Sequence, residues 1–224
     1  MTNTATRPTA QRTSSMFKTP KAKRIILAVI VVVVLILMGL GTKVVANGSG
    51  SAAAKGEFSA ASYGKTQFPK VQKAIEKRAE DASTLAEAIA ADPTAAGKKY
   101  GVPGTTGPEL SVKFTGTVSG PAEDGVYPVK VDGLPTALQI RVQTGPAING
   151  TDLRDATGKI KFGQFTNQID YQNAGAALNK QMKKSVLDKI DTTSLQGKTI
   201  DVVGAFQLIN PNGWLVTPVK LSVQ

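Results

Sequence analysis

The strongest pattern in the chain is an uninterrupted apolar run near its start. Residues 25–41 contain no polar or charged side chain, and a further apolar stretch ending at Ala46 follows Lys43. Crossing about 30 Å of hydrocarbon takes roughly 20 helical residues, and a helix satisfies its own backbone in lipid. We therefore predict a transmembrane helix over residues 25–46, which would contact the lipid bilayer from Ile25 to Ala46.

Basic residues set the predicted orientation of this helix. Three cations within residues 21–24 stand directly before the run, which places the tail 1–24 in the cytoplasm and the rest of the chain outside. A cleaved signal peptide is the alternative, with small residues near Ala46 or over 51–54 as processing sites. Both interpretations place the C-terminal part outside the cytoplasm. The chain has no cysteine, so we do not expect an anchor attached through a lipidated cysteine.

Helical periodicity follows a Gly-, Ala- and Ser-rich stretch, residues 47–65, which we expect to be a flexible tether. Apolar side chains then recur at three- and four-residue steps, the spacing of helices with one buried face. Asp92 before a proline suits the N-cap of a short helix, and Gly101 would end it. Residues 66–108 are thus predicted to form a helical cap. The predicted helix starts are Pro69, Ser83 or Thr84, and Pro93.

After Gly107 the apolar period changes to two, which is typical of strands. Residues 210–213 read Asn-Pro-Asn-Gly between the last two strands and predict a tight hairpin. A helix from about Tyr171 to Ile190 separates the third strand from the fourth, and a short extended piece is expected over 160–165. The predicted strands lie near 112–118, 126–131, 138–142, 199–209 and 214–223.

Three strands, a helix and a two-stranded hairpin follow one another in the order of an OB-type barrel, whose helix lies between strands three and four. The predicted fold class is therefore α+β: an N-terminal transmembrane helix, a short helical cap and an OB-like five-stranded β-barrel over residues 109–224. A mixed α+β sandwich is the alternative.

Composition excludes several kinds of site. The chain has neither cysteine nor histidine, so thiolate and imidazole metal sites, Ser-His-Asp triads and disulfides are impossible. The net charge of +11 suggests a nucleic-acid partner, but six of the 27 basic residues precede the apolar run and all 16 acidic residues follow it. The exported part is only mildly basic and poor in aromatics. We predict no nucleic-acid partner, no catalytic residues, no metal and no cofactor.

One segment of the predicted barrel, residues 145–171, is rich in glycine and in side chains that form hydrogen bonds. Arginine can hold a carboxylate or phosphate, and amides and tyrosine can bind a sugar. The structural alternative is that Arg154 pairs with Asp155 or Asp170 and that Asn167 or Thr166 caps the following helix. The predicted ligand-binding residues are Asn149, Arg154, Asp155, Asn167, Gln168 and Tyr171.

Several short phrases of the chain are familiar in combination: Asp92-Pro93, Lys98 to Gly101, Gly145-Pro146, Gly150 to Ala156, Phe165 to Tyr171 and Lys198 to Lys220. Together they resemble a bacterial family of predicted periplasmic lipoproteins, domain of unknown function 2291. The resemblance covers about residues 66–223. It implies an exported, membrane-tethered protein, and its frequent genetic neighbourhood with sugar ABC transporters implies an accessory role beside their subunits. Members of the lipoprotein type carry a cysteine for acylation, which this chain lacks.

Two functions are consistent with these observations. The first is a membrane-anchored extracytoplasmic accessory protein that acts beside a sugar ABC transporter. The second is an extracytoplasmic binding module for a carbohydrate or an anionic cell-wall polymer. An enzyme is not expected, because Asp152 and Asp155 on one short turn cannot easily face each other across a sugar.

Overall fold

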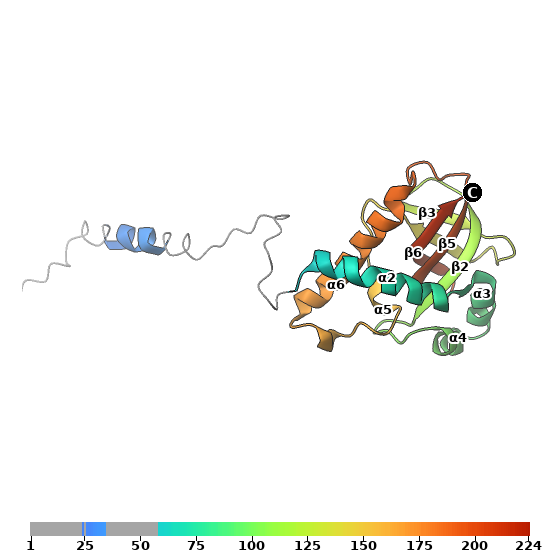
Figure 1. Ribbon diagram of the computed structural model, residues 1–224, viewed down its shortest axis with the longest axis horizontal. Coiled ribbons are helices and arrows are strands. Elements are labelled where there is room, and N and C mark those ends of the chain that lie inside the picture. The colour runs from blue at the N-terminus through green and yellow to red at the C-terminus, as the bar shows by residue number, and fades with distance from the viewer. Residues whose placement is uncertain (1–23, 25, 35–57) are drawn as a thin grey trace, which may run out of the picture. The chain divides into compact units, whose positions relative to one another are not determined.

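The computed structural model describes Arg24, residues 26–34 and residues 58–224. The chain divides into two units, residues 1–52 and 53–224, and each is considered by itself (Figure 1). In the first unit, residues 26–34 are helical and their apolar side chains are exposed.

Most of the predicted span 25–46 lies outside the described residues, as do the tail 1–23 and residues 47–57 of the predicted tether. Within the described part of the chain, no helix has both the length and the apolar character that crossing a membrane requires. The transmembrane helix therefore stays a prediction.

The second unit begins with a helix that starts earlier than predicted. Helix α2 spans Ala60–Arg78, and the Ser59 hydroxyl caps it by accepting a bond from the Ser62 amide at 3.4 Å. Pro69, predicted to open this helix, lies inside it on the exposed side. The helix tolerates the proline because the opposite side is fixed by burial of Gly64, Phe68, Val71 and Ile75.

Two short helices complete the predicted cap. Helix α3 spans Ala82–Ala91, and α4 spans Pro93–Tyr100. The carboxylate of Asp92 caps α4 as predicted, because it accepts bonds from the amides of Thr94 (2.8 Å) and Ala95 (3.0 Å). A two-residue strand, β1 (Glu80–Asp81), joins α2 to α3 and pairs in parallel with the first barrel strand.

Five strands close into a barrel with the connectivity of an OB fold. Each strand pairs with its neighbour in the order β2-β3-β4-β6-β5, and β5 pairs again with β2. All pairs are antiparallel except β4 with β6. A parallel pair needs a long crossover, and here residues 144–198 lead from β4 to β5, from which a hairpin leads to β6. The strands are β2 (Glu109–Val118), β3 (Val126–Lys130), β4 (Gln139–Gln143), β5 (Thr199–Gln207) and β6 (Gly213–Val223).

The crossover carries the helix that the sequence predicted between strands three and four. Helix α6 spans Gln168–Ser185, and the shorter α5 spans Asp152–Asp155. A 3₁₀ turn at Leu187–Lys189 follows α6 and occupies the end of the predicted helix. The extended piece predicted over 160–165 is wrong in part, because Phe162–Gln164 form a 3₁₀ turn there. The alternating apolar residues Ile160, Phe162 and Phe165 therefore lie in and beside this turn and not in a strand.

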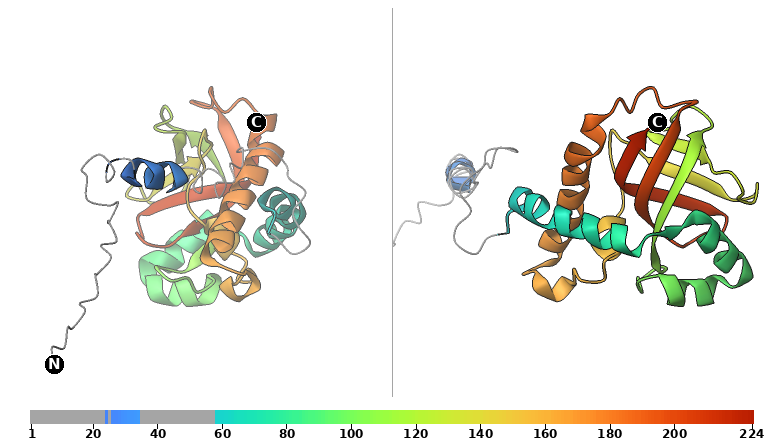
Figure 2. Two further views of the ribbon diagram at one scale, coloured as in Figure 1. Left: turned by 90° about the vertical axis from the view of Figure 1, so that its left-hand side faces the viewer. Right: turned by 45° about the vertical axis from the view of Figure 1, so that its right-hand side comes forward.

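Helices α2 and α6 cross on the outside of the barrel, as two views of the ribbon show (Figures 1 and 2). They approach closely at Gly64, where an added Cβ would lie 2.5 Å from the carbonyl oxygen of Ala177. Inside the barrel Trp214 stacks on Phe206 with ring centroids 4.7 Å apart, and its indole donates to the Pro211 carbonyl at 3.1 Å. The predicted hairpin thus anchors the core.

Candidate functional site

Three of the predicted site residues form one compact cluster. Arg154 on α5 donates to both carboxylate oxygens of Asp155 at 2.8 Å and to the Tyr171 carbonyl at 3.2 Å. Its guanidinium carbon lies 3.7 Å from the centroid of the Tyr171 ring, and the residue is 8% exposed. The guanidinium of Arg154 therefore binds groups of the protein itself. This agrees with the structural alternative, in which Arg154 pairs with Asp155.

The other three predicted residues do not join that cluster through their side chains. Asn167 caps α6, because its amide oxygen accepts a bond from the Asp170 backbone at 2.8 Å. Gln168 is the exposed first residue of α6. Asn149 is exposed, and its backbone amide donates to the Gln143 side chain at 3.0 Å. None of the six lines a groove described below, so their role in ligand binding stays a prediction.

A buried polar layer between the barrel and the helices escaped sequence reasoning. Glu109 at the start of β2 is 1% exposed; one carboxylate oxygen accepts from Gln207 at 3.0 Å, and the other has no partner among the described residues. Burial, followed by the charges of Asp152 and Asp155, raises the pKa of Glu109 to about 8. Nothing in the sequence distinguishes this glutamate from an exposed one.

Asp152 belongs to the same layer. The Thr217 hydroxyl donates to its carboxylate at 2.6 Å, and the Gln143 amide donates to that hydroxyl at 2.8 Å. Burial raises the pKa of Asp152 to about 6. Within the described residues no group of three acidic side chains is placed to hold a metal ion. The layer therefore resembles an internal polar network rather than an open binding site.

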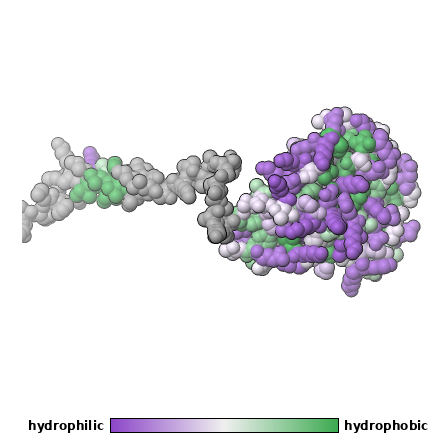
Figure 3. All heavy atoms as spheres, viewed as in Figure 1, coloured by the Kyte–Doolittle hydropathy of each residue, from purple (hydrophilic) through white to green (hydrophobic). Residues whose placement is uncertain are grey.

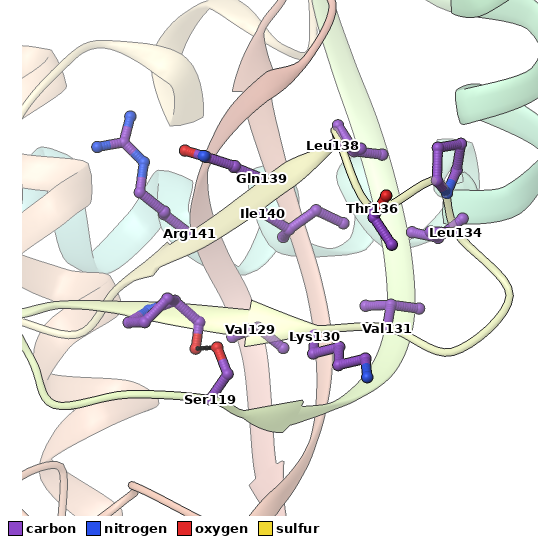
Figure 4. Close-up of a pocket in the computed structure, with 12 residues that line it drawn as sticks. Ser119, Val129, Lys130, Val131, Leu134, Thr136, Leu138, Gln139, Ile140 and Arg141 are labelled. Carbon is purple, nitrogen blue, oxygen red and sulfur yellow. Dashed lines mark hydrogen bonds between the residues drawn. The ribbon is translucent and has the colours of Figure 1, made fainter.

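The open site lies on a different surface, the face of β3 and β4. A groove of about 460 Å³ runs over these two strands and the loop that joins them (Figure 4). Its accessible apolar side chains are Val131, Leu134 and Leu138, which are partly buried, whereas Val129 and Ile140 belong to the barrel core beneath. Lys130 and Arg141 project from the two strands at its edge. The remaining lining residues are Ser119, Pro128, Pro135, Thr136 and Gln139.

The register of the two strands explains why both cations line one groove. Pro128 pairs with Arg141 and Val129 with Ile140. Since alternate residues share a face, Lys130 lies on the same outer face as Arg141, whereas Val129 and Ile140 are buried. No acidic residue lines the groove, and neither cation forms a salt bridge with another described residue. The groove therefore offers two cationic donors beside apolar surface.

Comparisons with known proteins agree with the predicted family and fold. The family model "predicted periplasmic lipoprotein (DUF2291)" matches residues 30–222, which confirms the family resemblance. A crystal structure of an OB-fold protein from Thermotoga maritima aligns with a TM-score of 0.62 and 20% identity, covering 75% of this chain and 99% of that one. No curated protein matches the chain. The α+β fold with an OB-type barrel is thus confirmed.

Proposed function

Because this chain belongs to the family of predicted periplasmic lipoproteins known as domain of unknown function 2291, we propose that it is a membrane-associated extracytoplasmic module that binds an anionic carbohydrate or cell-wall polymer on the β3–β4 face of its barrel. The single observation that carries the proposal is the groove with Lys130 and Arg141 at its edge and no acid among the described residues that line it. β3 and β4 are the second and third strands of the barrel, and OB folds bind oligosaccharides and oligonucleotides on that face.

The chemistry of the groove favours a phosphorylated or carboxylated polymer over a neutral sugar. A guanidinium and an ammonium bind such oxygens with charge-assisted hydrogen bonds. Leu134 and Leu138, which are only partly buried, supply apolar surface for the carbon backbone of the ligand. An aromatic platform, on which neutral sugar rings and nucleic-acid bases commonly stack, is absent from the lining residues. The location outside the cytoplasm argues further against nucleic acid.

Binding to the full chain in detergent provides the test. The probes are poly(glycerol phosphate), peptidoglycan fragments and a neutral glucan, and the readout is calorimetry together with the melting temperature, which a bound ligand raises by mass action. We expect an anionic polymer to bind. Lys130→Gln with Arg141→Gln should weaken binding about tenfold or more, since a hydrogen bond to a charged group contributes roughly 1.5–3 kcal/mol.

The matched control removes two exposed lysines of α2, Lys73→Gln with Lys77→Gln, and so makes the same change in net charge. It should retain the affinity of the unmodified protein. Equal losses in the two double variants would show that binding follows net charge alone and would overturn the assignment of the groove. No response to any anionic polymer would end the proposal for that class of ligand.

An accessory role beside a sugar ABC transporter, which the family resemblance implied, stays a prediction. Crosslinking in cells followed by identification of the captured proteins tests it. Recovery of transporter subunits only from cells with the unmodified groove would connect that role to Lys130 and Arg141.

A further inference from the structure

Two exposed large apolar side chains of the domain lie in one short segment, residues 162–169. Phe162 is 50% exposed and Ile169 is 67% exposed, and the only other exposed large apolar residue in the described part of the domain is Ile209 on the β5–β6 hairpin. Figure 3 shows that one face of the domain is largely hydrophilic, with smaller hydrophobic areas between the hydrophilic residues. Grouped exposed apolar residues are typical of a contact with a partner or a membrane, whereas single ones are common on any protein surface.

The same segment lies where the chain enters the domain. The Phe58 ring lies 5.7 Å from Phe165, Phe165 lies 5.4 Å from Tyr171, and Tyr171 lies 5.7 Å from Phe162, measured between ring centroids. This continuous row of rings connects the first described residue of the domain to the exposed Phe162. The apolar segment is therefore close to the point from which residues 47–57 lead to the predicted membrane anchor.

The length of that connection restricts how far this segment can lie from the bilayer. Residues 47–57 separate Phe58 from Ala46, where the predicted span ends. Even fully extended, a segment of this length reaches only about 40 Å. Tethering therefore holds Phe162 and Ile169 at a high effective concentration beside the membrane, whereas a separate protein would have to compete from solution.

The charges around the two apolar residues also favour a lipid surface. Residues 156–169 contain two lysines, Lys159 and Lys161, and no acidic residue. Both lysines are exposed. The nearest acid that follows, Asp170, already accepts a bond from the Asn167 amide at 3.1 Å. Aromatic and aliphatic side chains flanked by lysines are the composition that enters the headgroup region of anionic membranes.

From these observations we propose that the 3₁₀ turn and the start of α6 form a membrane-docking surface, in which Phe162 and Ile169 insert between headgroups while Lys159 and Lys161 contact anionic lipids. This surface would hold the domain against the membrane in one orientation. It does not depend on the ligand groove, which uses other residues on β3 and β4.

The absence of cysteine from the chain permits a direct test with single labels on the full protein in vesicles. Gly163→Cys carries a fluorophore beside Phe162, at a position where an added Cβ meets nothing within 4 Å. Ile209→Cys carries the control label, because the exposed fraction of Ile209, 66%, is close to the 67% of Ile169. The vesicles contain phosphatidylcholine with or without phosphatidylglycerol, and lipids with brominated chains quench any label that reaches them.

We expect strong quenching of the label at 163, stronger with phosphatidylglycerol, and little at 209. In the labelled background, Phe162→Ser with Ile169→Ser should lower the ratio of docked to undocked domain roughly tenfold or more, given the apolar surface returned to water. Lys159→Gln with Lys161→Gln should remove the dependence on phosphatidylglycerol, whereas Lys73→Gln with Lys77→Gln should preserve it.

Equal quenching at the two labelled positions would overturn the proposal, as would quenching at 163 that survives loss of both apolar side chains. Failure of the full chain to float with the vesicles would also overturn it. Trp214 fluorescence confirms that each variant is folded. Lys130→Gln with Arg141→Gln should leave the quenching unchanged, so that failure of the ligand groove and failure of the docking surface are separate results.

Discussion

Replacing Glu109 by glutamine should remove much of the loss of stability that the domain undergoes as the pH rises. Glu109 is buried on β2 with one oxygen unpartnered among the described residues, and burial raises its pKa from 4.5 to about 8. The folded domain therefore retains a proton that the unfolded chain releases. Between these two pKa values the native state binds more protons than the unfolded state, so the free energy of unfolding falls as the pH increases.

The size of this effect follows from the same two values. Between about pH 5 and pH 7, proton linkage with pKa values of about 4.5 unfolded and 8 folded lowers the free energy of unfolding by about 2–3 kcal/mol. Asp152, whose pKa is raised from 3.8 to about 6, adds roughly 1 kcal/mol of the same sign over that range. The glutamine side chain in Glu109→Gln resembles the protonated acid in shape and cannot ionise. The stability of the variant should therefore fall with pH only by the smaller amount that Asp152 contributes.

Urea denaturation of the full chain in detergent, followed by fluorescence, measures this effect. Trp214 is the only tryptophan and is stacked on Phe206 in the barrel core, so its emission reports on the domain alone. Glu76→Gln on the exposed face of α2 removes one carboxylate and serves as the control. Parallel stability profiles for the unmodified chain and Glu109→Gln from pH 5 to pH 7 (about the range of the linkage) would refute the reasoning.

Three further predictions use the same denaturation assay. Asp92→Ala should lower the free energy of unfolding by about 1 kcal/mol, because two amides of α4 lose their cap. Gly64→Ala should destabilise the domain by roughly 1–3 kcal/mol, because the new Cβ would lie 2.5 Å from a carbonyl oxygen of α6, whereas Gly163→Ala should change stability little. Arg154→Gln should cost about 2 kcal/mol, because the carboxylate beside it loses a bidentate partner.

The barrel could be predicted because its signals are local. Strands alternate between interior and exterior positions, and Asn210-Pro211-Asn212-Gly213 specifies the last hairpin. The position of α6 between the third and fourth strands then selects the OB order among five-stranded arrangements. The parallel pairing of β4 with β6 follows from that order rather than from any residue.

The start of α2 could not be predicted, for a physical reason that concerns its partner. Residues 60–64 are small except for Tyr63, and such a composition also describes a linker. In the structure Gly64 is small because α6 crosses there, with the Ala177 carbonyl within 2.5 Å of where a Cβ would be. The small residues that suggested a flexible tether are thus also the residues that a close helix crossing requires. Only the packing of α6 against this segment shows that it is a helix and not a linker.

The same dependence on partners separates the predicted site residues from the groove. Arg154 has the chemistry for binding an anion, but the neighbouring carboxylate and the Tyr171 carbonyl already accept its hydrogen bonds. Lys130 and Arg141 carry no distinguishing signal in the sequence and become a pair only through the register that places Pro128 opposite Arg141. The type of a residue indicates what its side chain can bind. Strand register and packing decide whether that side chain is free to bind a ligand or already bonded within the protein. For this reason Lys130 and Arg141, which form no salt bridge with another described residue, are better candidates for ligand binding than the segment richest in polar residues.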